Sequence, residues 1–323
     1  MSRVTLKQLA EYTGFSIRTV NRALKGDESV IDSKRSAILT AAKKFHYVPN
    51  MAARNLRMNQ TNFVGIIGEN AERQVFTKKL NFLERTLKAR GYYPILGYEK
   101  SDVKRFSKLL DDWSGITQKI IIMTSSELLQ KAAFKELLSY SPMDFIFVDA
   151  PEQENSVNFS IDRSSGVYEA IVYLGKMGHQ SILHCGSIAN RMDGIKKALS
   201  FFSKDQRPTV ESIISGNEFK DGYALGNRIV ASGADAVFFD TDRLASGFLY
   251  YAVEHQISIP DDIAVIGFDD DPADVYLYPT LSTVAQPIQE LAEAIADTIA
   301  DFPEAPETMS RVFNTKFIRR QSV

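Results

Sequence analysis

Short apolar runs alternate with amphipathic helical stretches along the chain from residue 63 onward. The runs with the length and composition of buried strands are 63–68, 93–97, 120–123, 145–149, 182–185, 236–240 and 263–269, with a last strand-like segment around 313–318. Strands that alternate with helices predict parallel sheets with helices on both faces. About 260 residues of this pattern exceed one typical domain, so we expect two lobes.

The first 47 residues are helical in pattern and contain no strand signal. Residues 5–8, Thr-Leu-Lys-Gln, match a capping box that can begin a helix. Gly14 suits a left-handed helix end, and Ser16 can cap a second helix at residues 17–24. The short turn would hold the second helix across the first, so residues 5–24 predict a helix-turn-helix. On this pattern alone, an ordinary helical hairpin with exposed arginines remains the alternative.

The outward face of the second helix suits DNA. Arg22 can offer two parallel donors to guanine, the commonest specific contact in the major groove. Ile17 and Arg18 lie at the end of the helix that enters the groove first, and the polar uncharged side chains nearby suit phosphates. The head residues that we expect to contact DNA are Thr5, Ser16, Ile17, Arg18, Thr19, Asn21 and Arg22.

Charge is divided unevenly along the chain. The net charge is −2, but residues 1–60 hold eleven Lys and Arg against four Asp and Glu, which gives +7 and leaves −9 for the rest. A small basic head on an acidic body is the layout expected of a protein whose head meets phosphates. A merely solvated charged face, the alternative, would normally mix both signs.

Composition and motifs exclude several other classes. Cys185 is the only cysteine, and neither an apolar signal region nor an uninterrupted apolar span is present, which predicts a cytoplasmic protein without a membrane partner. The four His and one Cys are not spaced as paired metal ligands, so His179 and His184 are expected to be structural. A nucleophile elbow, a P-loop and a Gly-rich dinucleotide fingerprint are absent. We therefore expect no enzyme, no metal and no cofactor.

Polar residues follow several of the expected strands. Ligands of open α/β sheets bind at the carboxyl ends of strands. The residues at these ends are Glu69, Asn70, Ser125, Ser126, Asp149, Asp240, Thr241, Asp242 and 269–271. Carboxylates there can bind a metal, act as acid–base pairs or accept hydrogen bonds from sugar hydroxyls, and helix capping is the alternative for some of them.

The head resembles a known family. Residues 4–24, VTLKQLAEYTGFSIRTVNRAL, look like the DNA-binding head of the lactose-repressor/galactose-repressor family, and residues 47–57, YVPNMAARNLR, are similar to its hinge helix. Asn21 departs from the family, where Ser is usual. The resemblance implies that the hinge orders on DNA and that two paired copies insert Leu56 into the minor groove. A flexible linker with an incidental leucine is the alternative. The hinge residues expected on DNA are Asn50, Ala53, Arg54, Leu56 and Arg57.

The body resembles the effector domain of the same family, which is related to periplasmic sugar-binding proteins. The segments that carry this resemblance are 162–166, 174–182, 191–194, 241–247, 259–270 and 279–287. The resemblance makes Arg191 and Asp269 the best effector contacts, a fork donor and an acceptor that suit vicinal hydroxyls or a carboxylate. The expected effector contacts are Glu69, Asn70, Ser125, Asp149, Arg191, Phe219, Thr241, Asp242 and Asp269, with Phe219 as the aromatic that would stack on a sugar face. Ala150, Arg163 and Thr241 differ from the family's usual residues, which argues against a pocket for the commonest sugars.

Together these features predict an all-α helix-turn-helix head at 1–47, a hinge helix or linker at 48–61, and a two-lobed α/β domain at 62–323. This last part is expected to be periplasmic-binding-protein-like, with parallel sheets, and to bind effector and dimerise. Its N-lobe is expected at about 62–154 plus 284–308, and its C-lobe at about 155–283 plus 309–323.

The function that follows is a ligand-responsive, sequence-specific transcriptional regulator, more specifically a repressor. We expect a homodimer, since the leucine-heptad tail of the family's tetramers is absent, and a roughly palindromic operator of double-stranded DNA. The expected effector is a small polar molecule such as a sugar or sugar derivative. Alternatives are an exported sugar-binding protein, an α/β enzyme with a DNA-binding head, and a regulator with a phosphocarrier protein as co-effector.

Overall fold

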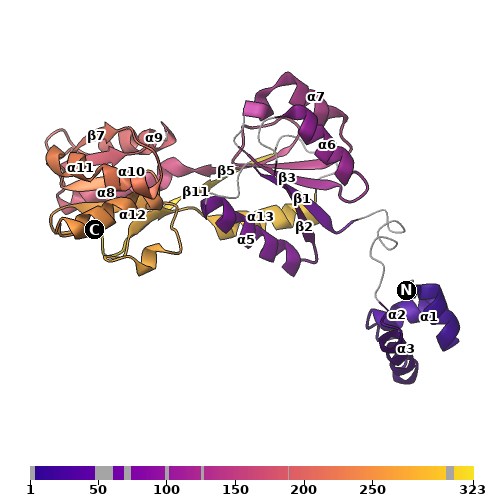
Figure 1. Cartoon of the computed structure of the whole chain (residues 1–323). Coiled ribbons are helices and arrows are strands. Elements are labelled where there is room, and N and C mark those ends of the chain that lie inside the picture. The colour runs from indigo at the N-terminus through magenta and orange to yellow at the C-terminus, as the bar shows by residue number, and fades with distance from the viewer. Residues whose placement is uncertain are drawn as a thin grey trace. The chain divides into compact units, whose positions relative to one another are not determined.

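The computed structural model describes residues 4–47, 61–68, 74–98, 102–124, 127–187, 189–302 and 309–323. The chain divides into two compact units, a head at residues 1–61 and a body at residues 62–323 (Figure 1). The expected hinge, apart from Thr61, lies outside the described residues. Within the described part of the chain, no helix is both long enough and apolar enough to cross a membrane.

Three helices form the head: α1 (Leu6–Thr13), α2 (Ile17–Leu24) and α3 (Asp32–Lys44). The expected capping box is present, because the Thr5 hydroxyl accepts a hydrogen bond from the Gln8 amide and the Gln8 side chain accepts one from the Thr5 amide. Gly14 ends α1 in the left-handed conformation, with φ of 71°. The helices share a core of Leu9, Ala10, Val20, Ala23, Val30, Ile38, Ala41 and Ala42. The predicted helix-turn-helix is therefore confirmed, and α3 packs against it.

The first lobe of the body is built on a parallel six-stranded sheet of order β11-β5-β4-β3-β1-β2. Its strands are β1 (Phe63–Gly68), β2 (Tyr93–Tyr98), β3 (Lys119–Met123), β4 (Asp144–Val148), β5 (Val157–Asp162) and β11 (Met309–Asn314). Helices α5 (Gln74–Ala89) and α13 (Ile288–Ala300) share one core with this sheet, and α6 (Val103–Trp113) and α7 (Ala132–Tyr140) share another. Both faces of the sheet are therefore covered (Figure 1).

The second lobe repeats this plan with a sheet of order β12-β10-β9-β8-β6-β7, in which only β12 runs antiparallel to its neighbour among the described strands. Its strands are β6 (Ser181–Cys185), β7 (Thr209–Ile213), β8 (Ala236–Phe239), β9 (Ala264–Phe268), β10 (Ser282–Ala285) and β12 (Lys316–Ile318). One face packs on α8 (Arg163–Met177) and α9 (Ala189–Leu199). The other face packs on α11 (Gly226–Ser232) and α12 (Asp242–Glu254), and α10 (Phe219–Ala224) packs against α12.

The seven expected strands are all present, and the prediction of two lobes with parallel sheets is confirmed. Three strands were not predicted: β5, β7 and β10. The last expected segment, around 313–318, is not one strand but parts of two, β11 in the first sheet and β12 in the second. The sequences of β5 and β7, VNFSID and TVESI, interleave polar with apolar residues and so lack the continuous apolar run of a buried strand.

The expected lobe boundaries near residues 155 and 309 differ from the structure by one strand each. Strand β5 pairs with β4, and β11 pairs with β5, so both belong to the first sheet rather than to the second lobe. The chain crosses between the lobes after these strands, because their hydrogen-bonding partners lie in the first sheet.

Candidate functional site

The second helix of the head presents a polar face. Val20 and Ala23 of α2 are buried, while Arg18, Asn21 and Arg22 are exposed. This division follows from the helical period, since residues three and four apart share a face. The predicted set of DNA-contacting side chains on α2 therefore lies outward, available to a groove.

The start of α2 is fixed by a local cap. The Ser16 hydroxyl accepts a hydrogen bond from the Thr19 amide at 3.1 Å and lies 2.9 Å from the Thr19 hydroxyl. Ile17, at the same end, is 44% exposed, which is unusual for an isoleucine and suits contact with an apolar base edge. Thr5 caps α1 in the same way, so its predicted DNA contact has to share a hydroxyl with the cap.

Arg22 is held in place by an acidic side chain that the sequence analysis did not single out. Its Nε donates to Asp27 Oδ2 at 2.8 Å, and its Nη2 contacts Ser29. The hydrogen bond and the charge of Arg22 lower the pKa of Asp27, and the same bond raises the pKa of Arg22. Asp27 therefore sets the direction of the guanidinium at the C-terminal end of α2.

Several predicted contacts lie outside the described residues: Asn50, Ala53, Arg54, Leu56 and Arg57 of the hinge, and Glu69, Asn70 and Ser125 of the body. The other predicted effector contacts, Asp149, Arg191, Phe219, Thr241, Asp242 and Asp269, are described.

Asp149 follows β4 and lies among cations. Its carboxylate accepts hydrogen bonds from Lys79 of α5, from both terminal nitrogens of Arg163 at 2.8 and 3.2 Å, and from the Ile161 amide at 3.2 Å. Burial raises the cost of ionising Asp149, but the two cations outweigh it and lower its pKa. Burial likewise lowers the pKa of Lys79, against the attraction of Asp149.

Arg191 and Asp269 form the corresponding pair in the second lobe. Arg191 of α9 is buried, donates to the Asp240 carbonyl at 3.2 Å and lies over the Phe268 ring, 3.4 Å from its centroid. Burial lowers the pKa of Arg191 to about 10, against the pull of Asp269 and Asp240. Asp269 follows β9, and its carboxylate accepts a hydrogen bond from Gln286 at 2.6 Å. Burial raises the pKa of Asp269, and Arg191 opposes this.

These groups meet although they come from two sheets. Asp269 of the second lobe interacts electrostatically with Lys79 of the first lobe. Arg163 begins α8 of the second lobe, donates to Asp149 of the first lobe, and interacts electrostatically with Arg191. We call Lys79, Asp149, Arg163, Arg191 and Asp269 the cross-lobe cluster. It offers an ammonium, two guanidinium groups and two carboxylates, which can orient a polar ligand by hydrogen bonds.

The remaining predicted effector contacts have other partners. Thr241 caps α12 and donates to the Asn217 carbonyl at 3.1 Å. Asp242, which is 1% exposed, accepts from the Asp271 amide and the Thr283 hydroxyl, so it holds the turn that carries Asp269. Phe219 is 43% exposed with its ring 5.9 Å from that of Tyr250, as part of an aromatic surface.

Sequence reasoning did not select Lys79, Arg163 or Gln286 as site residues. Lys79 stands three residues after Phe76 and four before Leu83, so it shares the core-facing side of α5 with them. A lysine at this helical spacing among apolar residues could have been recognised as a buried charge. The partners of Arg163 and Gln286 lie 14 and 17 residues away, and only the fold brings them together.

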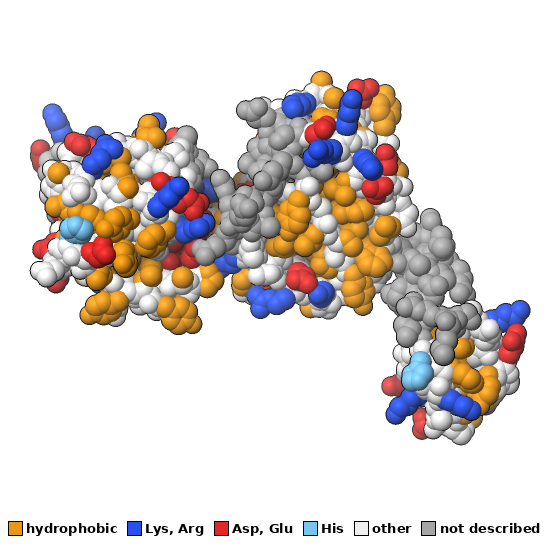
Figure 2. Space-filling view, in the orientation of Figure 1, with side chains coloured by type: hydrophobic (Ala, Val, Ile, Leu, Met, Phe, Trp, Pro, Cys, Tyr) orange, Lys and Arg blue, Asp and Glu red, His pale blue; other side chains and the backbone are white. Residues whose placement is uncertain are grey.

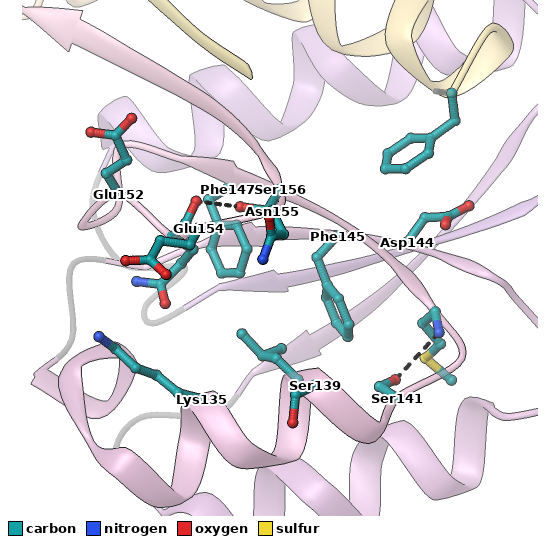
Figure 3. Close-up of a pocket in the computed structure, with 14 residues that line it drawn as sticks. Lys135, Ser139, Ser141, Asp144, Phe145, Phe147, Glu152, Glu154, Asn155 and Ser156 are labelled. Carbon is teal, nitrogen blue, oxygen red and sulfur yellow. Dashed lines mark hydrogen bonds between the residues drawn. The ribbon is translucent and has the colours of Figure 1, made fainter. Parts of the chain in front are cut away.

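Across the described residues, no group of three His, Cys, Asp or Glu is placed to hold a metal ion. A cavity of about 570 Å³ lies in the first lobe, between α7 and residues 152–156 (Figure 3). Lys135 and Ser139 of α7 and Asp144 and Phe145 of β4 are among its lining residues, and it shares none with the cross-lobe cluster.

Comparison with protein families matches both units. Residues 5–50 match the model described as bacterial regulatory proteins, lacI family, and residues 171–323 match the periplasmic binding protein-like domain. A regulator named MalR from Clostridium butyricum is 25% identical over 338 aligned positions, covering 99% of both chains. The repressor PurR of Pectobacterium atrosepticum is 27% identical over 310 positions, covering 92% of this chain and 89% of PurR.

Solved structures share the fold across the whole chain. The Lac repressor dimer bound to operator and the anti-inducer ONPF has a TM-score of 0.79 at 19% identity, covering 99% of each chain. The regulator CelR in complex with cellobiose has a TM-score of 0.64 at 20% identity, covering 99% of this chain and 100% of CelR. The capped head therefore matches the model of the lacI family of bacterial regulatory proteins, and over nearly its whole length the chain is similar to the transcriptional regulators MalR and PurR.

Proposed function

We propose that the protein is a ligand-responsive transcriptional repressor that binds a specific DNA sequence as a homodimer. The observation that carries this proposal is the combination, on one chain, of a capped helix-turn-helix and a two-sheet body with a charged cluster at its strand ends. The head would read DNA and the body would sense the ligand. A protein that binds operator DNA in this way acts in the cytoplasm.

For DNA reading, α2 is the recognition helix. Its N-terminal end, with Ile17 and Arg18, enters the major groove, and Arg22 offers its fork to a guanine. Hydroxyl and amide side chains of the head contact phosphates and fix the register. Because Asp27 already orients Arg22, less side-chain freedom is lost when the arginine binds a base.

Dimerisation is supported by apolar surface on both lobes (Figure 2). In the second lobe, large aromatic side chains are between 37% and 87% exposed: Phe219, Tyr223, Tyr250, Tyr276 and Tyr278. In the first lobe, Tyr93, Leu96 and Tyr98 of the edge strand β2 are each 48% exposed. Exposed apolar patches of this kind mark interaction surfaces. A second copy of the chain would cover them and supply a second head for the other half of a palindrome.

For the effector, we propose a small polar, sugar-like molecule bound at the cross-lobe cluster. Solved structures with this fold are described with ribose, cellobiose or D-xylulofuranose bound. The cluster provides charged donors and acceptors at the carboxyl ends of β4 and β9, where open α/β sheets bind ligands. Glu69, Asn70 and Ser125 would complete this site.

The ligand would act by linkage. A molecule that binds groups of both lobes in the cross-lobe cluster favours one arrangement of the lobes, and that arrangement favours or disfavours the spacing of two heads on DNA. Coupling free energies of this kind are typically about 1–3 kcal/mol, or roughly 5- to 150-fold in affinity.

The test selects an operator for the full chain from random DNA and then measures its affinity with and without a panel of sugars and sugar derivatives. We expect one compound to change operator affinity by roughly 5- to 150-fold. The same factor must describe the effect of operator on the affinity for that compound, because linkage is reciprocal. Selection of no sequence would contradict DNA reading, and affinity that no compound alters would contradict ligand control.

A further inference from the structure

We propose that the effector carries an acidic group, a carboxylate or a phosphate, which binds to Lys79 and Arg163 while a hydroxyl of the same molecule binds Asp269. The effector is then a sugar acid or a sugar phosphate rather than a neutral sugar. This inference rests on the proposed function, since it assigns the chemical class of the ligand to the cross-lobe cluster.

The hydrogen-bonding capacity of Asp149 is filled by its neighbours in the protein. An ionised carboxylate has about four lone-pair positions. Asp149 accepts from Lys79, from two nitrogens of Arg163 and from the Ile161 amide, so these four contacts use its capacity. A sugar hydroxyl therefore finds no acceptor at Asp149, although an aspartate at a strand end is otherwise a natural partner for one.

The cations around Asp149, in contrast, have donors to spare. Within the described part of the chain, the Lys79 ammonium is hydrogen-bonded to Asp149 alone, although it carries three N–H groups. Arg163 uses Nη1 and Nη2 for its described contacts, to Asp149 and the Ile161 carbonyl, and has Nε besides. A ligand at this point has to bring acceptors, and carboxylate and phosphate oxygens are the strongest acceptors for ammonium and guanidinium donors.

The buried charges around Asp149 also favour an acidic ligand. Lys79 and Arg163 share the single negative charge of Asp149, and all three groups are largely buried, with side-chain exposures of 9% for Lys79, 16% for Asp149 and 21% for Arg163. Asp269 and Arg191 add one charge of each sign, so the cross-lobe cluster holds three cations and two carboxylates. A buried cation without its own counter-charge is costly, because a low dielectric strengthens every uncompensated charge. An anionic ligand supplies the missing counter-charge, which a neutral sugar does not.

A second group beside the cluster repeats this arrangement. Asp270 lies between Lys78 of α5, at 3.2 Å, and Arg320, at 2.5 Å. Lys78 and Lys79 are consecutive residues of α5, and each forms an ion pair with an aspartate that also has an arginine partner. Asp149 is paired with Arg163, and Asp270 with Arg320. The first lobe therefore faces the ligand site with an excess of positive charge.

The acceptor left for a hydroxyl is Asp269. Its described hydrogen bond comes from Gln286 and uses Oδ1, which leaves Oδ2 for a ligand among the contacts of the described residues. Arg191 lies near Asp269 in the second lobe and can bind a second hydroxyl or the acid itself. The cluster therefore fits a molecule with an acidic end toward the first lobe and hydroxyls toward the second.

The test uses the full chain and three sugars, each as the neutral sugar, a carboxylate and a phosphate. The triplets are D-galactose, D-galacturonate and D-galactose 6-phosphate; D-glucose, D-glucuronate and D-glucose 6-phosphate; and D-ribose, D-ribonate and D-ribose 5-phosphate. Binding is measured by calorimetry and by thermal unfolding at constant ionic strength. We expect an acidic form to bind and its neutral parent to bind at least about tenfold more weakly, as the loss of a charge-assisted hydrogen bond implies. The acid that binds, carboxylate or phosphate, identifies which of the two groups the site takes.

Two variants connect this preference to the residues. In Lys79→Met the aliphatic stem is kept and the charge is lost, and in Arg163→Asn the second cation is lost. Each should weaken binding of the acidic form by about 10- to 100-fold and bring it close to the neutral form. Lys135→Met, which removes a lysine at the separate cavity of the first lobe, is the matched control and should leave the preference unchanged. Circular dichroism of each variant verifies that it is folded.

Each remaining outcome decides the question. A neutral parent that binds as tightly as its acids overturns the inference, and if it also changes operator affinity, the proposed function stands without it. If no triplet binds, inorganic phosphate is compared with chloride as the minimal anion. Stabilisation of the wild type by phosphate that Lys79→Met abolishes supports the inference, and equal effects of phosphate and chloride overturn it.

Discussion

The buried carboxyl groups of Asp242 and Asp274 predict an unusual pH dependence of stability. Both are 1% exposed and face each other beneath the turn at residues 269–271. Burial raises the pKa of Asp274 to about 7, although Asp242 and Arg320 favour its ionised form. The perturbation that tests this is Asp274→Asn, which keeps the shape of the side chain and removes its titration.

The sign follows from linkage. Because the folded state holds the Asp274 proton more tightly than the unfolded state, the stabilising contribution is complete below the ordinary pKa near 3.8 and is lost as pH rises through about 7. A pKa difference of about 3 corresponds to a ceiling of about 4 kcal/mol. Between pH 5 and pH 7 the contribution of Asp274 to the free energy of unfolding falls by about 2 kcal/mol, and the Asp274→Asn variant should not show this fall.

The assay is equilibrium urea unfolding of the full chain at pH 5, 6 and 7 and constant ionic strength, followed by circular dichroism. The free energy of unfolding of Asp274→Asn, relative to wild type, should rise by about 2 kcal/mol from pH 5 to pH 7. Asp261→Asn, at an exposed site of the same lobe, makes the same charge change and should show no such rise. A pH-independent difference between Asp274→Asn and wild type would show that Asp274 does not titrate with a raised pKa in the folded protein.

Two predictions concern the head. Arg22→Ala should reduce discrimination between the selected operator and its guanine-substituted variants by roughly 5- to 150-fold and leave weak, salt-sensitive binding; unchanged discrimination in a gel-shift titration would contradict the role of Arg22. Ile38→Ala, at a fully buried position of α3, should destabilise the head by about 2–5 kcal/mol. Differential scanning calorimetry should then show a lowered head transition and an unchanged body transition, and a shift in both would contradict independent units.

The head could be predicted from the sequence because its signals are local. The Thr5–Gln8 capping box, Gly14 and Ser16 all act within four residues, and each is present as the sequence implied. The alternation of apolar runs and helices likewise predicted both lobes. Strands β5 and β7 were not predicted, because these segments become strands through pairing with β4 and β6 rather than through their own residue pattern.

The proposed ligand site could be predicted only in part. Asp149 and Asp269 were visible as acids at strand ends, but the contact between Lys79 and Asp149 joins residues 70 positions apart. Phe219 was placed by resemblance, and its contact with an effector stays a prediction; its ring centroid lies 5.9 Å from that of Tyr250. Helix α10 lies close against α12 there, since a side chain on Gly247 would meet the Phe219 carbonyl oxygen.

Two copies of this chain are proposed to read one operator. This is tested by the affinity and stoichiometry of the full chain on the selected operator, on a single half-site, and on the operator with its half-sites moved apart by half a helical turn. We expect two chains per operator, symmetric protection of both half-sites, and much weaker binding to the other two DNAs. One chain per DNA, with the half-site bound as tightly as the full operator, would contradict it.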